Sequence, residues 1–489
     1  MILLAFLLLF TPVLRAQDDP GEAMEKEIKK VVDVFVTLDR EAADPVSADQ
    51  ALYQGAIPGM LKSLDPHSIF FDPDQFEQMN QMQRSEQKGF GTVVSVLPGR
   101  VIVLQATTGT PSAKAGLSAG DEILAVNNIV LARLETDQLI QVLGQARQQQ
   151  ATLDVRRPGN ARLVRITLTP ELVDTPSVDR AFLLAPGLGY IRITGFEQST
   201  GKLVKESIEK LGGESLKGLV IDLRDNPGGA VQAAVETASL FLNPEKLIFT
   251  IKGRNMKDEE ARVPKFAKPY AFPVAMLVDD KTASASEILS GALQDHDRAV
   301  ILGEPSYGKG LVQNVFPLSG NTGLALTIAF YYTPSGRSIQ KPLASGQLDV
   351  ATIVPSGTFH TDAGREVQGG GGIQPDEVVH PAALSRLSAV LDATGYITTF
   401  AGEFLRTHDI GDDFEVTPAM LDELQVFLSS RNIRPGIAEW LSHREWLQSR
   451  LKEEIFNLKF GVAKGDEIGM QRDAVVQHAL VILRSDTRR

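Results

Sequence analysis

Residues 282–287 read Thr-Ala-Ser-Ala-Ser-Glu, and residues 307–310 read Tyr-Gly-Lys-Gly. An apolar run from Pro273 to Val278 leads into the first segment and predicts a buried strand. The apolar positions that follow have helical spacing: Ile288, Leu289, Ala292 and Leu293. Ser284 is therefore expected at a strand-to-helix turn, which exposes its hydroxyl and places backbone N–H groups beside it for anion stabilisation.

Lys309 is expected on a second strand-like segment, with Leu311, Val312 and Gln313 following it. Alternate residues of an extended segment share a face, so Lys309 and Gln313 can point the same way. A serine at a strand-to-helix turn with a lysine base is one of the convergent forms of nucleophilic hydrolysis. Taken alone, Ser284 is a small helix-start residue and Lys309 a solvated charge, but the surrounding motifs favour a nucleophile and its base.

The two segments resemble the carboxyl-terminal processing peptidases, which are Ser-Lys proteases with an embedded PDZ domain. The spacing from Ser284 to Lys309 fits that family's dyad, and Gln313 fits its third member, which orients the lysine. The resemblance covers about residues 60–380, with the motifs in family order. It implies an α/β multi-domain fold, in which a βα-repeat core of crotonase or ClpP type carries an inserted PDZ domain.

A lysine acts as a general base at neutral pH only if it is uncharged part of the time. Burial lowers the pKa of a lysine from about 10.4, by up to several units. Ser284 would then pass its proton to Lys309 while attacking a peptide carbonyl, and Lys309 would return it to the leaving amine as the acyl-enzyme forms. Gln313 would hold the amine without adding charge, whereas a carboxylate there would keep the lysine protonated.

Residues 173–380 alternate strand-like and helical patterns. This alternation predicts a mostly parallel sheet with helices packed on it. Reaction centres of such sheets lie beyond the carboxyl ends of the strands, which is where Ser284 is expected.

A glycine-containing loop, Asn226-Pro227-Gly228-Gly229, follows the strand expected over Leu219–Leu223. Glycines let backbone N–H groups approach a substrate closely. The family pattern implies Gly228 or Gly229 as one donor to an oxyanion and the Ala285 N–H as the other. Without its position after this strand and before the helix expected from Val231, the loop would be interpreted as an ordinary strand-to-helix turn.

Residues 84–172 resemble a PDZ domain. Its clearest part, Thr110–Leu117 with Gly120–Asn127, predicts a short helix, a glycine stop, a turn and a strand. A groove helix is expected over Ala132–Ala146, with four apolar positions: Leu134, Leu139, Ile140 and Leu143. In PDZ domains the loop before the first strand receives a peptide's terminal carboxylate, and the peptide adds as a strand. That loop is here Gly89, Phe90, Gly91 and Thr92.

Composition narrows the class of protein. The chain has 489 residues, so about two to four domains are expected. A net charge of −12 and a pI of about 5.2 argue against a nucleic-acid partner. There is no cysteine, which excludes disulfides, cysteine-based metal sites and a thiol nucleophile. The seven histidines have no metal-ligand spacing, so neither metal nor cofactor is expected.

The two ends of the chain predict other roles. Residues 1–16 are almost wholly apolar and predict a cleaved signal peptide, with an uncleaved membrane anchor as the alternative. Helical patterns follow over residues 17–83 and 381–489. The C-terminal region is interpreted as a packing, oligomerisation or adaptor-binding domain. Two further family-like motifs, 331–340 and 372–376, are interpreted as structural.

These observations together predict an exported, for example periplasmic, serine endopeptidase. It would bind the free C-termini of protein substrates and cleave their peptide bonds with Ser284 as the nucleophile. A homo-oligomer and an adaptor protein are further candidate partners. One alternative is a catalytically silent PDZ scaffold, which would need a damaged dyad. Another is an acyl-CoA enzyme, which would need neither a PDZ domain nor a serine–lysine pair.

Overall fold

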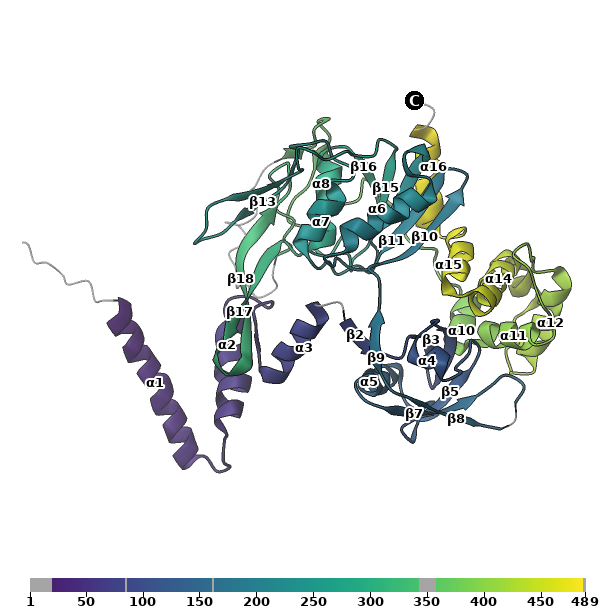
Figure 1. The fold of residues 1–489 in the computed structure, drawn as a ribbon, viewed down its shortest axis with the longest axis horizontal. Helices are drawn as coiled ribbons and strands as arrows, with labels where there is room; N and C mark the ends of the chain where they lie inside the picture. Colours follow the sequence, from purple (N-terminus) through teal and green to yellow (C-terminus); the bar gives the residue numbers. More distant parts are fainter. Residues whose placement is uncertain (1–19, 84–85, 161, 343–357, 487–489) are drawn as a thin grey trace, which may run out of the picture. The chain divides into compact units, whose positions relative to one another are not determined.

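The structure is a computed structural model that describes residues 20–83, 86–160, 162–342 and 358–486 (Figure 1). The expected signal peptide, residues 1–16, lies outside the described residues. Contacts divide the chain into two units, one of residues 1–73 with 315–326 and one of residues 74–314 with 327–489. Among the helices of the described ranges, none combines the length and the apolar character needed to span a bilayer.

The first unit is mainly helical, as the N-terminal pattern predicts. Its elements are α1 (Pro20–Glu41), the π-helix η1 (Asp49–Ala56), α2 (Ile57–Lys62) and the short strand β1 (Ile69–Phe71). β1 pairs antiparallel with β18 (Thr322–Tyr332), with Ile69 opposite Ala325.

A six-stranded sheet forms the centre of the second unit. Its strands lie in chain order: β10 (Val178–Ala185), β11 (Leu188–Ile193), β12 (Gly218–Asp222), β15 (Val274–Val278), β16 (Ala299–Gly303) and β21 (Glu377–Val378). Only the pair β10–β11 is antiparallel, and every other neighbouring pair is parallel. The expected mostly parallel sheet is therefore present.

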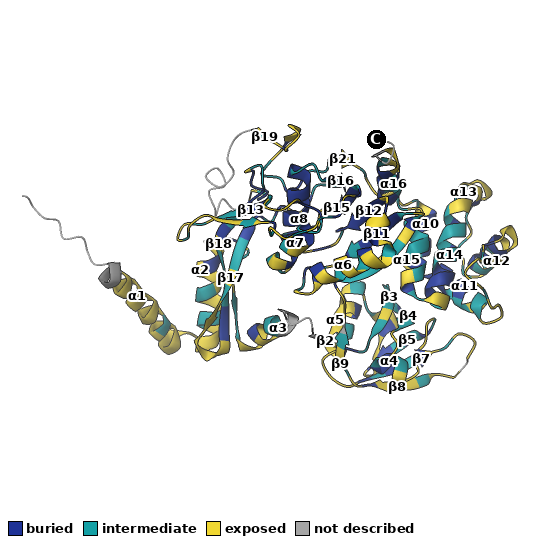
Figure 2. Ribbon diagram, turned by 45° about the horizontal axis from the view of Figure 1, so that its top comes forward, coloured by how far each residue is buried: buried dark blue, intermediate teal, exposed yellow. Residues whose placement is uncertain are grey.

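Helices cover both faces of this sheet, because successive side chains of a strand point to opposite faces. Ile221 and Met276 pack in a core with the helices α6 (Thr200–Leu211), α7 (Val231–Ala238) and α8 (Ala285–Asp295). Val220 and Leu277 face the other way and pack against α16 (Ala474–Asp486). Figure 2 shows the central strands β12, β15 and β16 as mostly buried and the outer faces of the helices as exposed.

The position of α16 differs from expectation. Residues 381–489 are mainly helical as predicted, but the last helix belongs to the core of the sheet and not to a separate region. Val476, Ala479 and Leu480 of α16 are buried against the sheet.

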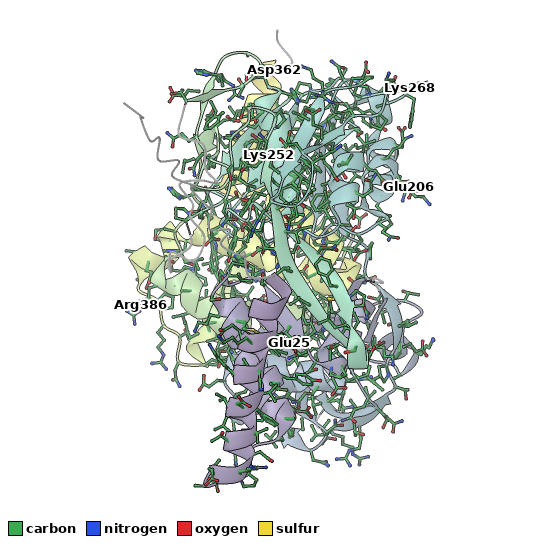
Figure 3. All side chains as sticks on the ribbon, turned by 90° about the vertical axis from the view of Figure 1, so that its left-hand side faces the viewer. Glu25, Glu206, Lys252, Lys268, Asp362 and Arg386 are labelled. Carbon is green, nitrogen blue, oxygen red and sulfur yellow. The ribbon has the colours of Figure 1, made fainter. Side chains whose placement is uncertain are left out.

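Charged side chains such as Glu206 and Lys268 are exposed at the surface of the molecule (Figure 3).

A second sheet contains β17 (Leu311–Leu318), β18, β13 (Leu247–Lys252) and β14 (Glu259–Arg262). β17 pairs with β18 in this sheet. The expectation that Lys309 lies on this strand was wrong, because β17 begins at Leu311 and Lys309 lies in the loop that leads into it.

The PDZ-like region forms a small antiparallel sheet. Its strands are β3 (Thr92–Leu97), β4 (Arg100–Ala106), β5 (Glu122–Val126), β6 (Ile129–Val130), β7 (Ala151–Arg156) and β8 (Val164–Leu168). Two helices accompany it, α4 (Pro111–Lys114) and α5 (Thr136–Ala146). Two strands flank it, β2 (Glu86–Gly89) and β9 (Glu171–Asp174). Leu139 is fully buried, but Ile140 is 57% exposed, so its assignment to the apolar face of the groove helix was wrong.

The helices of the C-terminal region before α16 share a core of their own. They are α10 (Arg386–Thr394), α11 (Tyr396–Leu405), α12 (Pro418–Ser429), α13 (Ile437–Ser442), α14 (Arg444–Phe460) and α15 (Val462–Met470). A further helix, α3 (Pro73–Gln83), precedes the PDZ-like region and does not belong to this core. Buried Leu424, Leu451 and Ile455 belong to this core.

One carboxyl of this helical core makes stability depend on pH. Burial raises the pKa of Glu453 on α14 to about 7, with Arg450 opposing the shift and Glu454 adding to it. In the unfolded chain a glutamate has a pKa of about 4.3. Because the pKa of Glu453 is higher in the folded state, its contribution to the free energy of unfolding is most favourable below the pKa of the unfolded chain. This contribution is lost as the pH rises through about 7.

We expect Glu453→Gln to stabilise the protein above neutral pH, since glutamine avoids the cost of burying the charge. The gain in the free energy of unfolding should grow by about 1–2 kcal/mol between about pH 5.5 and about pH 8.5. Urea unfolding at the two pH values measures it, with the exposed Glu423→Gln as the control. An equal gain at both pH values would contradict the raised pKa of Glu453.

Candidate active site

Ser284 lies at the expected strand-to-helix turn. The turn connects β15 with α8, and Ser284 is the residue before the first turn of the helix. Its φ of 56° and ψ of −115° are rare for a residue with a side chain, and such strained conformations cluster at functional sites. The side chain is half-buried.

The Asn226 loop lies directly beside this turn, because the parallel strands β12 and β15 end at the same edge of the sheet. The Ala283 N–H donates to the Asn226 carbonyl at 3.0 Å, and the Ser286 hydroxyl donates to the same oxygen at 3.2 Å. Asn226 is fully buried, and its side-chain amide donates to the Ile193 carbonyl at 2.7 Å. The loop is thus bonded both to the turn that carries Ser284 and to the neighbouring strand β11.

Gly228 is the loop residue nearest to Ser284. Its φ is 97°, in the region that favours glycine, and a Cβ there would lie 2.8 Å from the Ala285 nitrogen and 2.8 Å from Ser284 Cβ. The structure therefore brings Gly228 and Ala285 together beside Ser284. The Gly228 N–H donates to Asn226 Oδ1 at 2.9 Å.

Gly229 and Ala285 supply the other predicted N–H donors. Gly229 has a φ of 141°, and a Cβ there would lie 2.1 Å from the Phe196 carbonyl oxygen, so the close approach requires glycine. Ala285 is the first residue of α8, where an N–H has no partner within its own helix. Its position at the positive end of the helix favours a developing oxyanion.

Glu287, on the first turn of α8, links the serine to the lysine. The N–H groups of Ser284 and Lys309 both donate to Glu287 Oε2, at 2.8 and 2.9 Å. The Ser306 hydroxyl and the Gly308 N–H donate to Oε1, at 2.5 and 2.7 Å. Glu287 is fully buried. Burial raises the pKa of this carboxyl, while the four donors oppose the shift.

The Lys309 backbone is therefore linked to the Ser284 turn through Glu287, and the Lys309 side chain is half-buried. Gln313 lies four residues further on in β17 and is also half-buried. The role of Gln313 in orienting the lysine stays a prediction.

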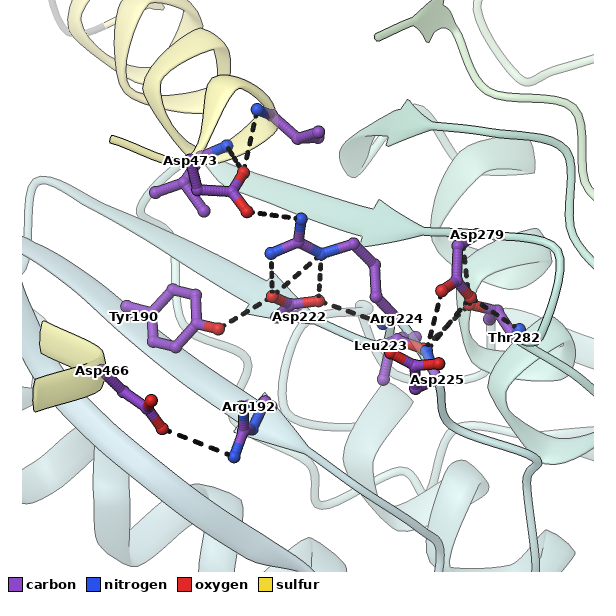
Figure 4. A network of polar contacts seen from close by, with 12 residues as sticks. Tyr190, Arg192, Asp222, Leu223, Arg224, Asp225, Asp279, Thr282, Asp466 and Asp473 are labelled. Atoms are coloured by element: carbon purple, nitrogen blue, oxygen red, sulfur yellow. Dashed lines mark hydrogen bonds and ion pairs between the residues drawn. The ribbon is translucent and has the colours of Figure 1, made fainter. Parts of the chain in front are cut away.

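A buried ionic network supports the strand end from which the Asn226 loop starts (Figure 4). Asp222 accepts a hydrogen bond from the Tyr190 hydroxyl at 2.8 Å and from the Arg224 guanidinium at 2.6 Å. Arg224 also donates to Asp473 at 2.7 Å, and Asp473 accepts the first N–H groups of α16. The C-terminal helix is thereby linked to the edge of the sheet that carries the site.

The predicted carboxylate-binding loop joins β2 to β3. Gly91 has a φ of 68°, and a Cβ there would collide with the side chain of Thr110. The Ser112 N–H donates to the Phe90 carbonyl at 2.9 Å, and the Ser112 hydroxyl donates to the Gly91 carbonyl at 3.0 Å. Gly89, Phe90, Gly91 and Thr92 line a cavity whose wall includes Leu143 of α5.

His296 lies at the opposite end of α8 from Ser284, as its position in the sequence indicates. Its ring contacts Asp362 and the Leu247 carbonyl, at 2.8 and 2.7 Å. Within the described ranges, no group of acidic or histidine side chains has an arrangement that could hold a metal ion.

The sequence interpretation assigned no role to Glu287, although a signal was present. Ser284 and Glu287 have the spacing of a capping box, in which the side chain of the third helical residue accepts the N–H of the residue before the helix. The bond from the Ser284 N–H has this form. The contacts of Glu287 with Ser306, Gly308 and Lys309 had no such local signal.

Comparison with known proteins assigns two parts of the chain to families. The family description of peptidase family S41 matches residues 187–350, and that of the PDZ domain matches residues 102–157. The protein is thus a serine-type peptidase that carries a PDZ domain.

Two curated relatives are similar over most of their length. The chain is 34% identical over 322 residues to the carboxy-terminal-processing protease of Bartonella bacilliformis, covering 64% of this chain and 73% of the relative. It is 29% identical over 320 residues to the carboxy-terminal processing protease CtpB of Bacillus subtilis, covering 65% and 66%. The chain therefore belongs to the carboxyl-terminal processing peptidases of family S41, which confirms the resemblance seen in the sequence.

Among solved structures, the photosystem II D1 C-terminal processing protease matches with a TM-score of 0.42 and 25% sequence identity. That match covers 74% of this chain and 94% of the other.

Proposed function

We propose that this protein cleaves peptide bonds through an acyl-enzyme on Ser284, with Lys309 as the general base and Gln313 orienting the lysine. Lys309 takes the serine proton as Ser284 attacks the carbonyl, and it gives a proton to the leaving amine. Water then hydrolyses the ester. The N–H groups of Ala285 and of Gly228 or Gly229 stabilise the oxyanion.

The observation that carries this proposal is the shared acceptor, Glu287 Oε2. The N–H groups of Ser284 and Lys309 both donate to this one buried oxygen, at 2.8 and 2.9 Å. Such a link holds a nucleophile and a base on different elements at a fixed separation, as intramolecular catalysis requires.

For Gly228 to act as a donor, its N–H must turn from Asn226 Oδ1 towards the substrate. The Ala285 N–H needs no such change, because the first N–H of a helix lacks an intrahelical partner. Ala285 is thus the better supported of the oxyanion donors, and Gly229 lies next to Gly228 in the same loop.

The PDZ domain is proposed to bind the free C-terminus of a protein substrate. The terminal carboxylate would meet the N–H groups of Gly89–Thr92, and the peptide would add as a strand beside β3. Residues 1–16 support export of the chain, for example to a periplasm, with cleavage of the segment as a signal peptide. A second copy of the chain and an adaptor protein are further candidate partners.

The test is cleavage of an unstructured protein with an apolar C-terminus, offered with a free and with an amidated carboxyl. Wild type should cleave the free form and lose most of this activity on the amidated form. Ser284→Ala should cleave neither. Cleavage by Ser284→Ala would overturn the dyad, and equal cleavage of both substrates would overturn tail recognition. A folded wild type that cleaves neither but binds the free tail would favour the silent scaffold.

A further inference from the structure

The loop that carries Lys309 is enclosed by the end of β18 and the residues that follow it, together residues 331–341. The Tyr331 N–H donates to the Gly310 carbonyl at 2.8 Å, and the Lys341 N–H donates to the Gly308 carbonyl at 3.0 Å. These bonds lie on both sides of Lys309. The segment interpreted from sequence as structural therefore lies against the proposed base.

Both glycines beside Lys309 are required by this enclosure. A Cβ on Gly310 would lie 2.9 Å from the Gln340 nitrogen, and one on Gly308 would lie 2.5 Å from Lys341 Cγ. Gly308 also has a φ of 86°, which favours glycine. The sequence Gly-Lys-Gly thus fits a loop that another segment approaches closely on either side.

Three successive N–H groups of this loop donate to side-chain oxygens. Those of Gly308 and Lys309 donate to Glu287, and that of Gly310 donates to Gln340 Oε1 at 2.9 Å. Gln340 is 2% exposed, and its Nε2 donates to the Lys341 carbonyl at 2.7 Å. The Gln340 side chain therefore has both a donor and an acceptor bond and a fixed orientation.

The segment is itself anchored to α8, the helix that carries the nucleophile. Arg337 is fully buried, and its guanidinium donates to Asp295 Oδ1 at 2.7 Å. The Ser335 N–H donates to the other oxygen of Asp295 at 2.9 Å. Gln340 is thus held to the same helix as Ser284 by a second, independent route.

We propose that Gln340 is a positioning residue for Lys309, which fixes the lysine loop through the residue that follows Lys309, whereas Glu287 fixes it through Lys309 and the residue before it. This inference rests on the proposed function, since it takes Lys309 as the base. Gln340 acts through the Gly310 N–H and does not need to contact substrate. Without the Gln340 side chain, the Gly310 N–H would lose its acceptor, and the loop would be held by Glu287 and by the two backbone bonds from Tyr331 and Lys341.

The neutral amide at position 340 fits the chemistry of the base. Glu287 of α8 already places one carboxyl against the loop. Other titratable residues next to the loop are Tyr331 and Lys341 of the enclosing segment and Tyr307 of the loop itself. Lys341 Nζ donates to the Ser306 carbonyl at 2.8 Å. A second carboxylate here would favour the ammonium form of Lys309 and oppose its action as a base.

The first variant is Gln340→Met, which keeps the volume and removes both hydrogen bonds. We expect kcat to fall between about tenfold and about a hundredfold with KM unchanged, because the base is displaced but substrate binding is not. The matched control is Gln448→Met in the C-terminal helices, which loses a glutamine Nε2 bond to a backbone carbonyl of the same 2.7 Å length. Its kcat should equal that of wild type.

The second variant, Gln340→Glu, restores an acceptor for the Gly310 N–H and adds a charge. Its kcat/KM should be low at neutral pH and recover towards wild type at high pH, with the rising limb of the pH profile moved upward. A purely structural role of Gln340 would not predict this shift.

The inference is overturned if Gln340→Met keeps kcat within about twofold of wild type, or if Gln340→Glu is no better than Gln340→Met at any pH. Ser284→Ala, assayed alongside, separates this failure from that of the proposed function. If Ser284→Ala cleaves, the serine mechanism is wrong; if it is silent while Gln340→Met is normal, only the role of Gln340 falls.

Discussion

Lys309→Arg is expected to lower kcat by about a thousandfold or more, although it keeps a long cationic side chain at the same place. A lysine can lose its proton in a poorly solvated site, whereas an arginine stays charged in proteins. An arginine at position 309 can therefore bind near Ser284 but cannot accept its proton. The loss corresponds to about 4 kcal/mol of transition-state stabilisation.

The measurement is kcat on the free-tailed protein substrate, together with binding of that substrate. Lys281→Arg is the matched control, because Lys281 lies three residues before Ser284 but is 70% exposed and paired with Asp225. It should leave kcat unchanged. Lys309→Arg should bind the tail as wild type does. A kcat within about tenfold of wild type would show that Lys309 is not the base.

The backbone around Ser284 could be predicted because its signals are local. The apolar strand, the small residues and the helical spacing after Ser284 all lie within about two dozen residues. The same holds for the Asn226 loop, since the carboxyl ends of neighbouring parallel strands meet at one edge. The structure places both as the sequence indicates, and their catalytic roles stay a prediction.

Contacts between distant segments could not be predicted in the same way. Gln340 reaches Gly310 across 30 residues, and Arg224 reaches Asp473 across 249. Neither pairing has a periodicity or a turn signature. The packing of α16 on the sheet was missed for the same reason, because an amphipathic helix does not identify the surface that it covers.

Amphipathic patterns also failed at single positions. Ile140 fits the helical apolar spacing of α5, yet it is 57% exposed while the adjacent Leu139 is fully buried. Adjacent positions on a helix lie about 100° apart, so one of two neighbouring apolar residues commonly faces away from the core.

Glu287→Gln is expected to lower kcat by about a hundredfold to a thousandfold, although it changes few atoms. The carboxylate accepts four hydrogen bonds, from the N–H groups of Ser284, Gly308 and Lys309 and from the Ser306 hydroxyl. An amide has one acceptor oxygen, and its NH₂ group can only donate. At least one buried N–H must then face another donor.

The lysine loop loses at least one of its bonds to residue 287 whichever way the amide turns. If the amide oxygen faces Ser284 and Lys309, the NH₂ group faces the Gly308 N–H, which is also a donor. If the amide is turned over, the NH₂ group faces the N–H groups of both Ser284 and Lys309. Each buried donor left unpaired costs about 1–3 kcal/mol, so the free energy of unfolding should also fall. The effect on kcat should exceed what this loss of stability explains, because the shared oxygen sets the separation of the two reacting groups.

A matched control separates these two effects. Glu454→Gln also replaces a buried carboxylate, 3% exposed, but lies in the C-terminal helices beside Arg450. It should lower the midpoint of thermal unfolding and leave kcat unchanged at a temperature where the protein is folded. If Glu287→Gln lowers stability alone, with kcat equal to that of Glu454→Gln, then Glu287 supports the fold and the link between Ser284 and Lys309 has no catalytic role. A selective fall in kcat means that one buried oxygen determines how the nucleophile and its base meet.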